Sequence, residues 1–181
     1  AWVLRLKVIS ALSLCFQHDS VGFLEPERFE RLLPAIASQL DSAPEGAAAT
    51  AVDSAASAAG RVPGPEGAAA SPIGVFGWAL VECLSNMAVA SGTDDHWRPL
   101  HHAVLMTTRS DSVRTKLTAL EVVSSLVGRL AEEYLVLLPE AIPFLAELME
   151  DTSHAVEART QELVAQLEAI AGESLDPYMK A

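Results

Sequence analysis

Basic residues are scarce in this chain of 181 residues, which has 12 Lys and Arg against 24 Asp and Glu and a formal net charge of −12. Proteins that bind nucleic acid draw the sequence-independent part of their affinity from Lys and Arg side chains that contact phosphate. The composition therefore argues against a general affinity for nucleic acid and favours protein partners. Half of the residues are hydrophobic, which is enough to bury a sizeable core in one domain.

Cysteine is also rare, since only Cys15 and Cys83 are present and they fall on separate apolar stretches. We expect two buried, reduced thiols rather than a disulfide, in a reducing compartment. No signal peptide is visible, and no uninterrupted apolar run reaches the roughly 18 to 20 residues of a membrane span. We expect no membrane partner.

Motifs of common enzymes are missing, including G-x-S-x-G, a glycine-rich phosphate loop and H-E-x-x-H. His96, His101 and His102 lie near Asp94 and Asp95 in the sequence. Adjacent histidines on a helix point about 100° apart, and no Cys or Glu pattern completes a zinc set. We therefore expect packing or surface histidines, with no metal, no cofactor and no catalytic residues.

What the sequence does contain is a two-helix unit that occurs twice near the C-terminus and a third time interrupted by an insert. The two uninterrupted copies match at Pro99, Leu105, Met106, Val113, Leu120 and Val127 and at Pro143, Leu148, Met149, Val156, Leu163 and Ile170. This spacing is close to the period of roughly 40 to 47 residues of HEAT and armadillo repeats. The pattern predicts an all-α, HEAT-type helical solenoid of stacked antiparallel helix pairs.

Apolar spacing and helix start and stop signals place the individual helices. They are expected over residues 2–16, 27–40, 73–90, 94–108, 112–134, 139–149 and 153–171. Pro34, Pro99 and Pro143 each fall in the first helix of a pair, and a recurrent interior proline implies a recurrent geometry. The helix over residues 2–16 would then close a preceding pair, so we interpret residues 1–181 as a C-terminal HEAT-repeat domain that belongs to a longer chain.

Residues 42–72 separate the two helices of the first pair and are dominated by Ala, Gly, Ser and Pro. They include no aromatic residue and almost no large aliphatic one. This composition predicts a flexible insert that is mobile and dispensable for folding.

Charges are unevenly distributed along the chain. Basic residues gather in the middle helix pair, formed by the helices expected over residues 94–108 and 112–134, while residues 132–176 are acidic apart from Arg159. The basic group consists of Arg98, Arg109, Arg114, Lys116 and Arg129. It could meet RNA phosphate or an acidic partner. The interpretation we favour is a ladder of ion pairs between repeats, in which Arg114 pairs with Asp111 and with Asp151.

Three stretches carry a resemblance to a known family. They are WRPLHHAVLMTTRSDSVRTKLTALEVV, EEYLVLLPEAIPFLAELMED and QLEAIAGESLDPY, in this order. The region from residue 94 to Tyr178 closely resembles the C-terminal end of the large HEAT-repeat protein family associated with U-three small nucleolar RNA.

This resemblance implies a non-catalytic scaffold subunit of the small-subunit processome, located in the nucleolus of the nucleus. The family supports processing of the small-subunit ribosomal RNA precursor and transcription of ribosomal DNA by RNA polymerase I. Its implied partners are protein subunits of the particle, with small nucleolar RNA and precursor ribosomal RNA reached through the assembled particle. The repeat pattern alone would also suit a generic HEAT-repeat adaptor in transport or signalling.

Overall fold

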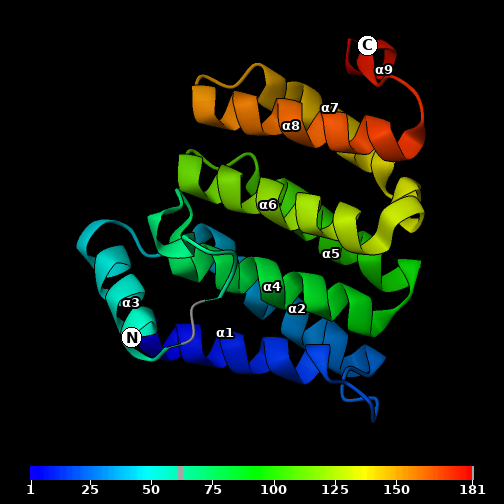
Figure 1. Cartoon of the computed structure of the whole chain (residues 1–181). Helices are drawn as coiled ribbons and strands as arrows, with labels where there is room; N and C mark the ends of the chain where they lie inside the picture. The colour runs from blue at the N-terminus through cyan, green and yellow to red at the C-terminus, as the bar shows by residue number, and fades with distance from the viewer. Residues whose placement is uncertain (61–62, 181) are drawn as a thin grey trace.

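The structure is a computed structural model that describes residues 1–60 and 63–180, and every regular element in that part of the chain is a helix (Figure 1). The elements are α1 (Trp2–Gln17), α2 (Pro26–Asp41), α3 (Gly46–Ala58), η1 (Ala68–Ala70), α4 (Gly74–Ser91), α5 (Asp94–Thr107), α6 (Val113–Leu130), η2 (Ala131–Val136), α7 (Leu138–Met149), α8 (His154–Ala171) and α9 (Asp176–Met179). The prediction of an all-α fold is confirmed.

The long helices form two stacked layers. Helices α1, α4, α6 and α8 contact one another in turn as one layer, and α2, α5 and α7 form the layer behind it. Helix α2 pairs with α4, α5 with α6, and α7 with α8. The first helix of each pair contains its interior proline, Pro34, Pro99 or Pro143. The chain is therefore a HEAT-type solenoid, and α1 occupies the position of the second helix in a preceding pair.

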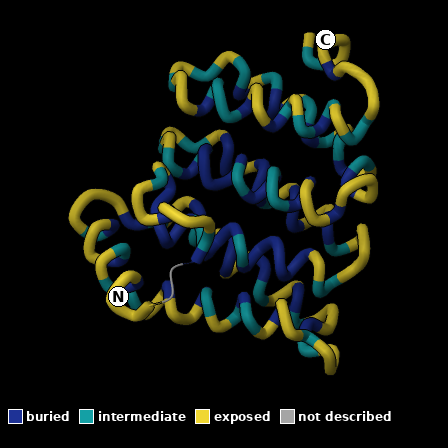
Figure 2. Tube along the Cα trace, in the orientation of Figure 1, coloured by how far each residue is buried: buried dark blue, intermediate teal, exposed yellow. Residues whose placement is uncertain are grey.

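The core lies between the two layers and is densest around α4 (Figure 2). Val75, Phe76, Leu80, Leu84 and Met87 of this helix are fully buried. By length and composition α4 could cross a membrane, yet neighbouring helices bury 72% of it. Its position at the centre of the stack accounts for its apolar composition.

Part of the stretch between α2 and α4 is helical, over residues 46–58 and 68–70. Helix α3 contacts α1 and α4, with Val52 and Ala56 buried in the contact. Alanine has the highest helix propensity of all residues, and its small side chain lets α3 approach the stack closely. Residues 46–58 of the expected flexible insert are therefore helical, and its mobility and dispensability stay predictions. Residues 61 and 62 of the same stretch lie outside the described residues.

Two local expectations are corrected. The helix predicted over residues 112–134 ends at Leu130, because Ala131 adopts a positive φ of 50° and the chain continues as η2. A non-glycine residue seldom adopts this conformation, so the sequence carried no stop signal. Cys15 is exposed rather than buried, whereas Cys83 is buried, and both thiols are free.

Candidate functional site

The polar side chains of the solenoid gather at the interfaces between neighbouring helix pairs, which we call seams. Lys116 on α6 and Asp151 before α8 form the most enclosed ion pair, with Nζ 2.5 Å from Oδ2 and side chains that are 17% and 9% exposed. The other oxygen, Oδ1, accepts the amide of Ser153 at 2.9 Å. Burial raises the pKa of Asp151, but Lys116 and the Ser153 amide outweigh it and hold that pKa below its usual value. Asp151 thus ties the second pair to the third.

Arg109 makes a second contact across this seam. Its Nε and Nη2 donate to the two carboxylate oxygens of Glu147 at 3.1 and 2.8 Å. The guanidinium carbon also lies 4.5 Å from the ring centroid of Phe144. Both charged side chains are about half exposed, so water screens the pair. Arg98 is paired within its own helix, 3.7 Å from Asp94.

Arg114 does not form the predicted pairs with Asp111 and Asp151. Its Nε and Nη2 donate to the carbonyl of Ile73 at 3.2 and 2.7 Å. Residues two apart on a helix face different directions, so when Lys116 faces Asp151, Arg114 points instead toward the start of α4. Among the described residues, Asp111 forms no salt bridge.

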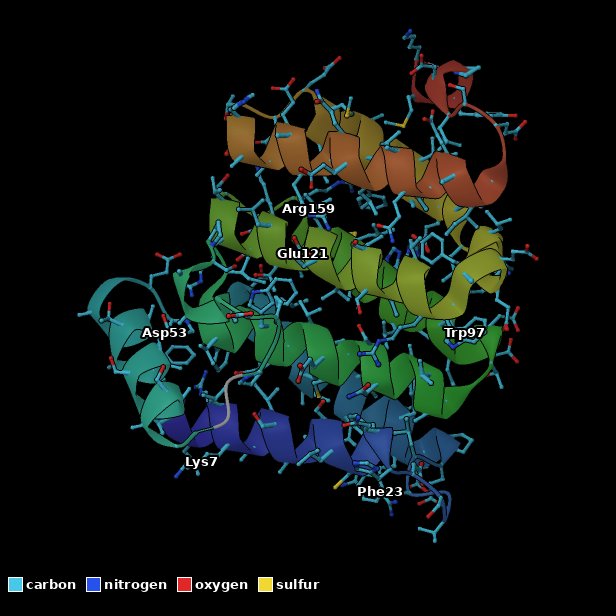
Figure 3. The ribbon with its side chains drawn as sticks, in the orientation of Figure 1. Lys7, Phe23, Asp53, Trp97, Glu121 and Arg159 are labelled. Atoms are coloured by element: carbon cyan, nitrogen blue, oxygen red, sulfur yellow. The ribbon has the colours of Figure 1, made fainter. Side chains whose placement is uncertain are left out.

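The start of α4 is therefore held by side chains from distant elements. Asp53 lies on α3 (Figure 3) and accepts the amide of Val75 through Oδ1 at 3.0 Å, close to the end of the Arg114 side chain. Gly74 lies between them with φ of 63°, and a Cβ at that position would meet the end of the Arg114 side chain. The positive φ is the reason that glycine is favoured here, because residues with a Cβ seldom adopt it.

The layer of α1, α4, α6 and α8 carries a polar ladder that sequence reasoning missed. Asn86 Nδ2 donates to Ser13 Oγ at 2.9 Å, and its Oδ1 accepts from Arg129. Farther along the layer, Ser85 bonds Ser125 and Ser124 bonds Gln166, each at 2.8 Å. The sequence signal that could have revealed this ladder is the recurrence of polar residues inside apolar helices at the spacing of the repeats.

Arg159, the isolated cation of the acidic half, belongs to the same layer. Its Nε and Nη2 donate to the carboxylate oxygens of Glu121 at 2.7 and 3.1 Å, linking α8 to α6 (Figure 3). Both side chains are about one-fifth exposed. The hydrogen bonds to Glu121 raise the pKa of the Arg159 guanidinium.

Two adjacent histidines meet a single carboxylate on the other layer. His101 Nδ1 lies 2.9 Å from Glu140 Oε2, and His102 Nδ1 lies 2.7 Å from Glu140 Oε1. The buried His101 also bonds the hydroxyl of buried Tyr134 at 2.7 Å through Nε2. Burial lowers the pKa of His101, and the bonds to Glu140 only partly oppose this.

The other residues that could have bound a ligand are also engaged in packing within the protein. His96 stacks on Phe29 with ring centroids 4.3 Å apart. Trp97 and Tyr134, which could have stacked on bases, are buried in the core. Within residues 1–60 and 63–180, no group of three or more His, Cys, Asp and Glu is arranged to hold a metal ion.

Each member of the basic group contacts another group of the protein. Arg98, Arg109 and Lys116 are paired with carboxylates, and Arg114 and Arg129 are bonded to a carbonyl and an amide. Arg159, outside this group, is also paired with a carboxylate. Exposed carboxylates of the last pair remain on the surface, namely Glu132, Glu133, Glu150, Glu162, Glu173 and Asp176. The surface of this end is therefore acidic.

The fold and these seams define the chain as a HEAT-repeat protein. No protein-family model matches the chain. The chain is 42% identical over 181 residues to an uncharacterized protein of Arabidopsis thaliana, covering 99% of this chain and 8% of that protein. It is 35% identical over 171 residues to HEAT repeat-containing protein 1 of Danio rerio, covering 94% of this chain and 7% of that protein.

A fungal relative has a name that refers to RNA. The chain is 32% identical over 174 residues to U3 small nucleolar RNA-associated protein 10 of Pyricularia oryzae, covering 96% of this chain and 8% of that protein. The chain belongs to the family that includes HEAT repeat-containing protein 1 and this U3-associated protein, which confirms the resemblance. It spans less than a tenth of the length of these relatives.

Proposed function

We propose that this chain is part of a non-catalytic scaffold subunit of the nucleolar small-subunit processome. In that role it supports processing of the small-subunit ribosomal RNA precursor and transcription of ribosomal DNA by RNA polymerase I. The observation that carries the proposal is the 32% identity, over nearly the whole chain, to a protein named for its association with U3 small nucleolar RNA. The proposed position is the C-terminal end of the subunit.

The seams support a scaffold rather than a catalyst. Their charged and polar groups are bonded to one another across repeats, as in Lys116 with Asp151 and Arg159 with Glu121. Such contacts fix the relative positions of neighbouring helix pairs. A stack of this kind offers an extended surface for binding other proteins.

In this proposal other parts of the assembled particle contact RNA, and this segment does not. The arginines and the lysine of the middle pair are engaged within the protein. The exposed carboxylates of the last pair repel phosphate. Protein subunits of the particle are therefore the proposed direct partners.

Affinity purification of the tagged full-length protein tests this function. We expect U3 small nucleolar RNA and processome proteins to be recovered with it, and removal of residues 94–181 to weaken their recovery. Depletion of the protein should cause unprocessed small-subunit ribosomal RNA precursor to accumulate. A full-length protein that recovers transport or signalling proteins and no U3 RNA would identify it as a generic HEAT-repeat adaptor instead.

A further inference from the structure

A hollow with a volume of about 530 Å³ lies where α1, α4 and α6 end, along one edge of the stack (Figure 1). Its lining combines two carboxylates, a guanidinium group, an amide and an aliphatic side chain, which belong to Asp19, Glu82, Arg129, Gln17 and Val89. Most of this lining is polar, and carboxylates outnumber cations in it.

A second hollow of about 480 Å³ adjoins the first. It is lined by the turn between α4 and α5 and by η2, including Glu133 and Val136. Val89 of the first hollow and Gly92 of the second are three residues apart at the end of α4, and three residues of helix span about 4.5 Å. The chain that runs from α6 into η2 also lines both hollows, through Arg129 and Glu133. The two hollows therefore form one surface, which we call the edge groove.

The edge groove has an excess of negative charge among the described residues that line it. The lining carboxylates are Asp19, Glu82, Asp94 and Glu133, and the lining cation is Arg129. Arg98 lies 3.7 Å from Asp94 on the same helix, but both side chains are about half exposed, so water screens this pair. The groove is complementary in charge to a cationic partner.

The ends of α1 and α4 add to this negative potential. The last carbonyl groups of a helix have no partner within the helix and form the negative end of its dipole. Within these two described helices, the last turns contain no Lys or Arg. A cation from outside the helices is therefore favoured at both ends.

Two of the carboxylates are held in place by backbone amides. Asp19 accepts the amides of Leu24 and Phe23 at 2.9 and 2.6 Å, which lowers the pKa of its carboxyl group and keeps it ionised. Glu82 accepts the amide of Gly64 through Oε1 at 2.9 Å. Side chains that are already fixed lose little conformational entropy when they bind a cation.

The edge groove also exposes aliphatic surface. Val89 is 50% exposed in the first hollow, and Val136 is 39% exposed in the second. Covering such side chains with other apolar groups is favourable. Arg129 donates one of its N–H groups to Asn86 Oδ1, and the others can donate to main-chain carbonyls of a bound segment. The groove thus offers partners for cationic, aliphatic and main-chain groups together.

We propose that the edge groove binds a segment of another protein that is rich in Lys or Arg and also contains aliphatic residues. Its cationic side chains contact Asp19, Glu82 and Glu133, and its aliphatic side chains cover Val89 and Val136. The carboxylates repel the phosphates of RNA, and a second copy of a chain with a net charge of −12 is equally unsuited. The inference rests on the proposed function, since a scaffold binds other proteins, and it gives the chemistry of one such partner.

Fluorescence anisotropy with residues 1–181 and the labelled synthetic peptide Lys-Arg-Val-Leu-Val-Lys-Arg tests this proposal. In a first comparison peptide Glu replaces each Lys and Arg, and in a second Ser replaces each Val and Leu. We expect saturable binding of the parent peptide that weakens between about 50 and 300 mM salt. The Ser peptide should bind at least about tenfold more weakly, and the Glu peptide should not bind.

The decisive variant combines Glu82→Gln with Glu133→Gln. Gln at position 82 can still accept the amide of Gly64, and Glu133 is exposed, so both changes should preserve the fold. The matched control combines Glu150→Gln with Glu173→Gln, which removes the same charge at exposed positions outside the lining of the groove. We expect the groove variant to weaken binding at least about fivefold and the control less than about twofold.

Equal weakening by the two variants would reveal a general attraction between an acidic surface and a basic peptide, and would overturn the proposal. The absence of saturable binding, or equal affinity for the parent and Ser peptides, would do the same. Val89→Ser with Val136→Ser should weaken binding of the parent peptide and leave the Ser peptide unaffected. Circular dichroism checks that each variant keeps its helical content.

Failure of this proposal is distinguishable from failure of the proposed function. Peptide binding is measured with purified components and does not depend on recovery of U3 RNA by the full-length protein. A full-length protein that recovers U3 RNA while the edge groove binds no cationic peptide would retain the scaffold function and exclude this partner.

Discussion

Asp53 Oδ1 accepts a hydrogen bond from the amide of Val75 at 3.0 Å, so a side chain of α3 binds the N-terminus of α4. The first amides of a helix have no partner within the helix. The insert, expected to be dispensable, thus supplies a partner for one of them at the most buried helix of the stack.

Replacement of Asp53 by Ala should therefore lower the free energy of unfolding by about 1 kcal/mol, the usual cost of losing a side-chain cap. Urea denaturation followed by circular dichroism measures this. Ser54→Ala, at an exposed position on the same helix, is the matched control and should be neutral. A neutral Asp53→Ala would support the original expectation that this segment is dispensable.

Leu120 offers a second test of stability. It is buried in the seam of α6 together with Leu117, Val123 and Val127. Leu120→Ala should cost on the order of 2 to 5 kcal/mol, from lost burial and the cavity left behind. Val113→Ala at a partly exposed position of α6 should change the free energy of unfolding by no more than about 0.5 kcal/mol. An unchanged denaturation midpoint for Leu120→Ala would mean that this face is exposed.

The pair of Lys116 and Asp151 gives a test that depends on pH. Lys116→Met should cost on the order of 1 to 2 kcal/mol at neutral pH, less than a fully buried pair because the side chains keep some contact with water. The pKa of Asp151 is lowered from 3.8 in the folded state. Its stabilising effect is therefore present above pH 3.8 and is lost as the pH falls below that value.

The difference between the unsubstituted chain and Lys116→Met should accordingly shrink at the most acidic pH at which both remain folded. Urea denaturation at a series of pH values measures it. A difference that stays constant down to the folded-state pKa would exclude an electrostatic origin. The double variant Lys116→Met and Asp151→Asn completes the cycle and isolates the interaction between the two residues.

His101 should make the chain sensitive to mild acid. Burial lowers its pKa below 6.5 in the folded state, so the unfolded chain takes up a proton first as the pH falls. Stability should decline from about pH 6.5 down to the folded pKa of this histidine. His101→Gln should remove this part of the pH dependence of the denaturation midpoint, and His154→Gln, at a histidine whose side chain is 92% exposed, should not.

RNA binding by the isolated segment should be weak and sensitive to salt. The net charge is −12, and the cations of the middle pair are bonded within the protein, as shown by Arg109 with Glu147. A gel-shift titration of precursor ribosomal RNA at several salt concentrations measures this. Tight, sequence-selective binding abolished by Arg114→Glu or Lys116→Glu in a chain that remains folded would reassign the basic group as an RNA site.

Much of the fold could be predicted because helical periodicity is a local property. The spacing of apolar residues identified the long helices, and the recurrence of Pro34, Pro99 and Pro143 grouped them into pairs. The break at Ala131 could not be found this way, because the residue has no intrinsic preference for a positive φ. Packing of η2 and Tyr134 against the core stabilises that conformation.

For the charged residues between repeats, the sequence indicated which residue types form ion pairs but not which residues pair with each other. The sequence indicated ion pairs between repeats, and such pairs exist, yet Lys116 rather than Arg114 binds Asp151. A shift of two positions on a helix turns a side chain by about 200°, so partner choice depends on the rotation of α6 against its neighbours. Only the packed structure determines that rotation.

The sequence by itself determined the long helices of the repeats, their grouping into pairs and the acidic character of the C-terminal pair, since all three follow from spacing and composition along the chain. Tertiary structure alone decided that the alanine-rich α3 packs on α1 and α4, that Asp53 binds the start of α4, and that His101 and His102 share Glu140. The physical reason is distance in sequence: these contacts join residues 22 to 39 positions apart. Their free energy is realised only when the repeats are stacked in one register.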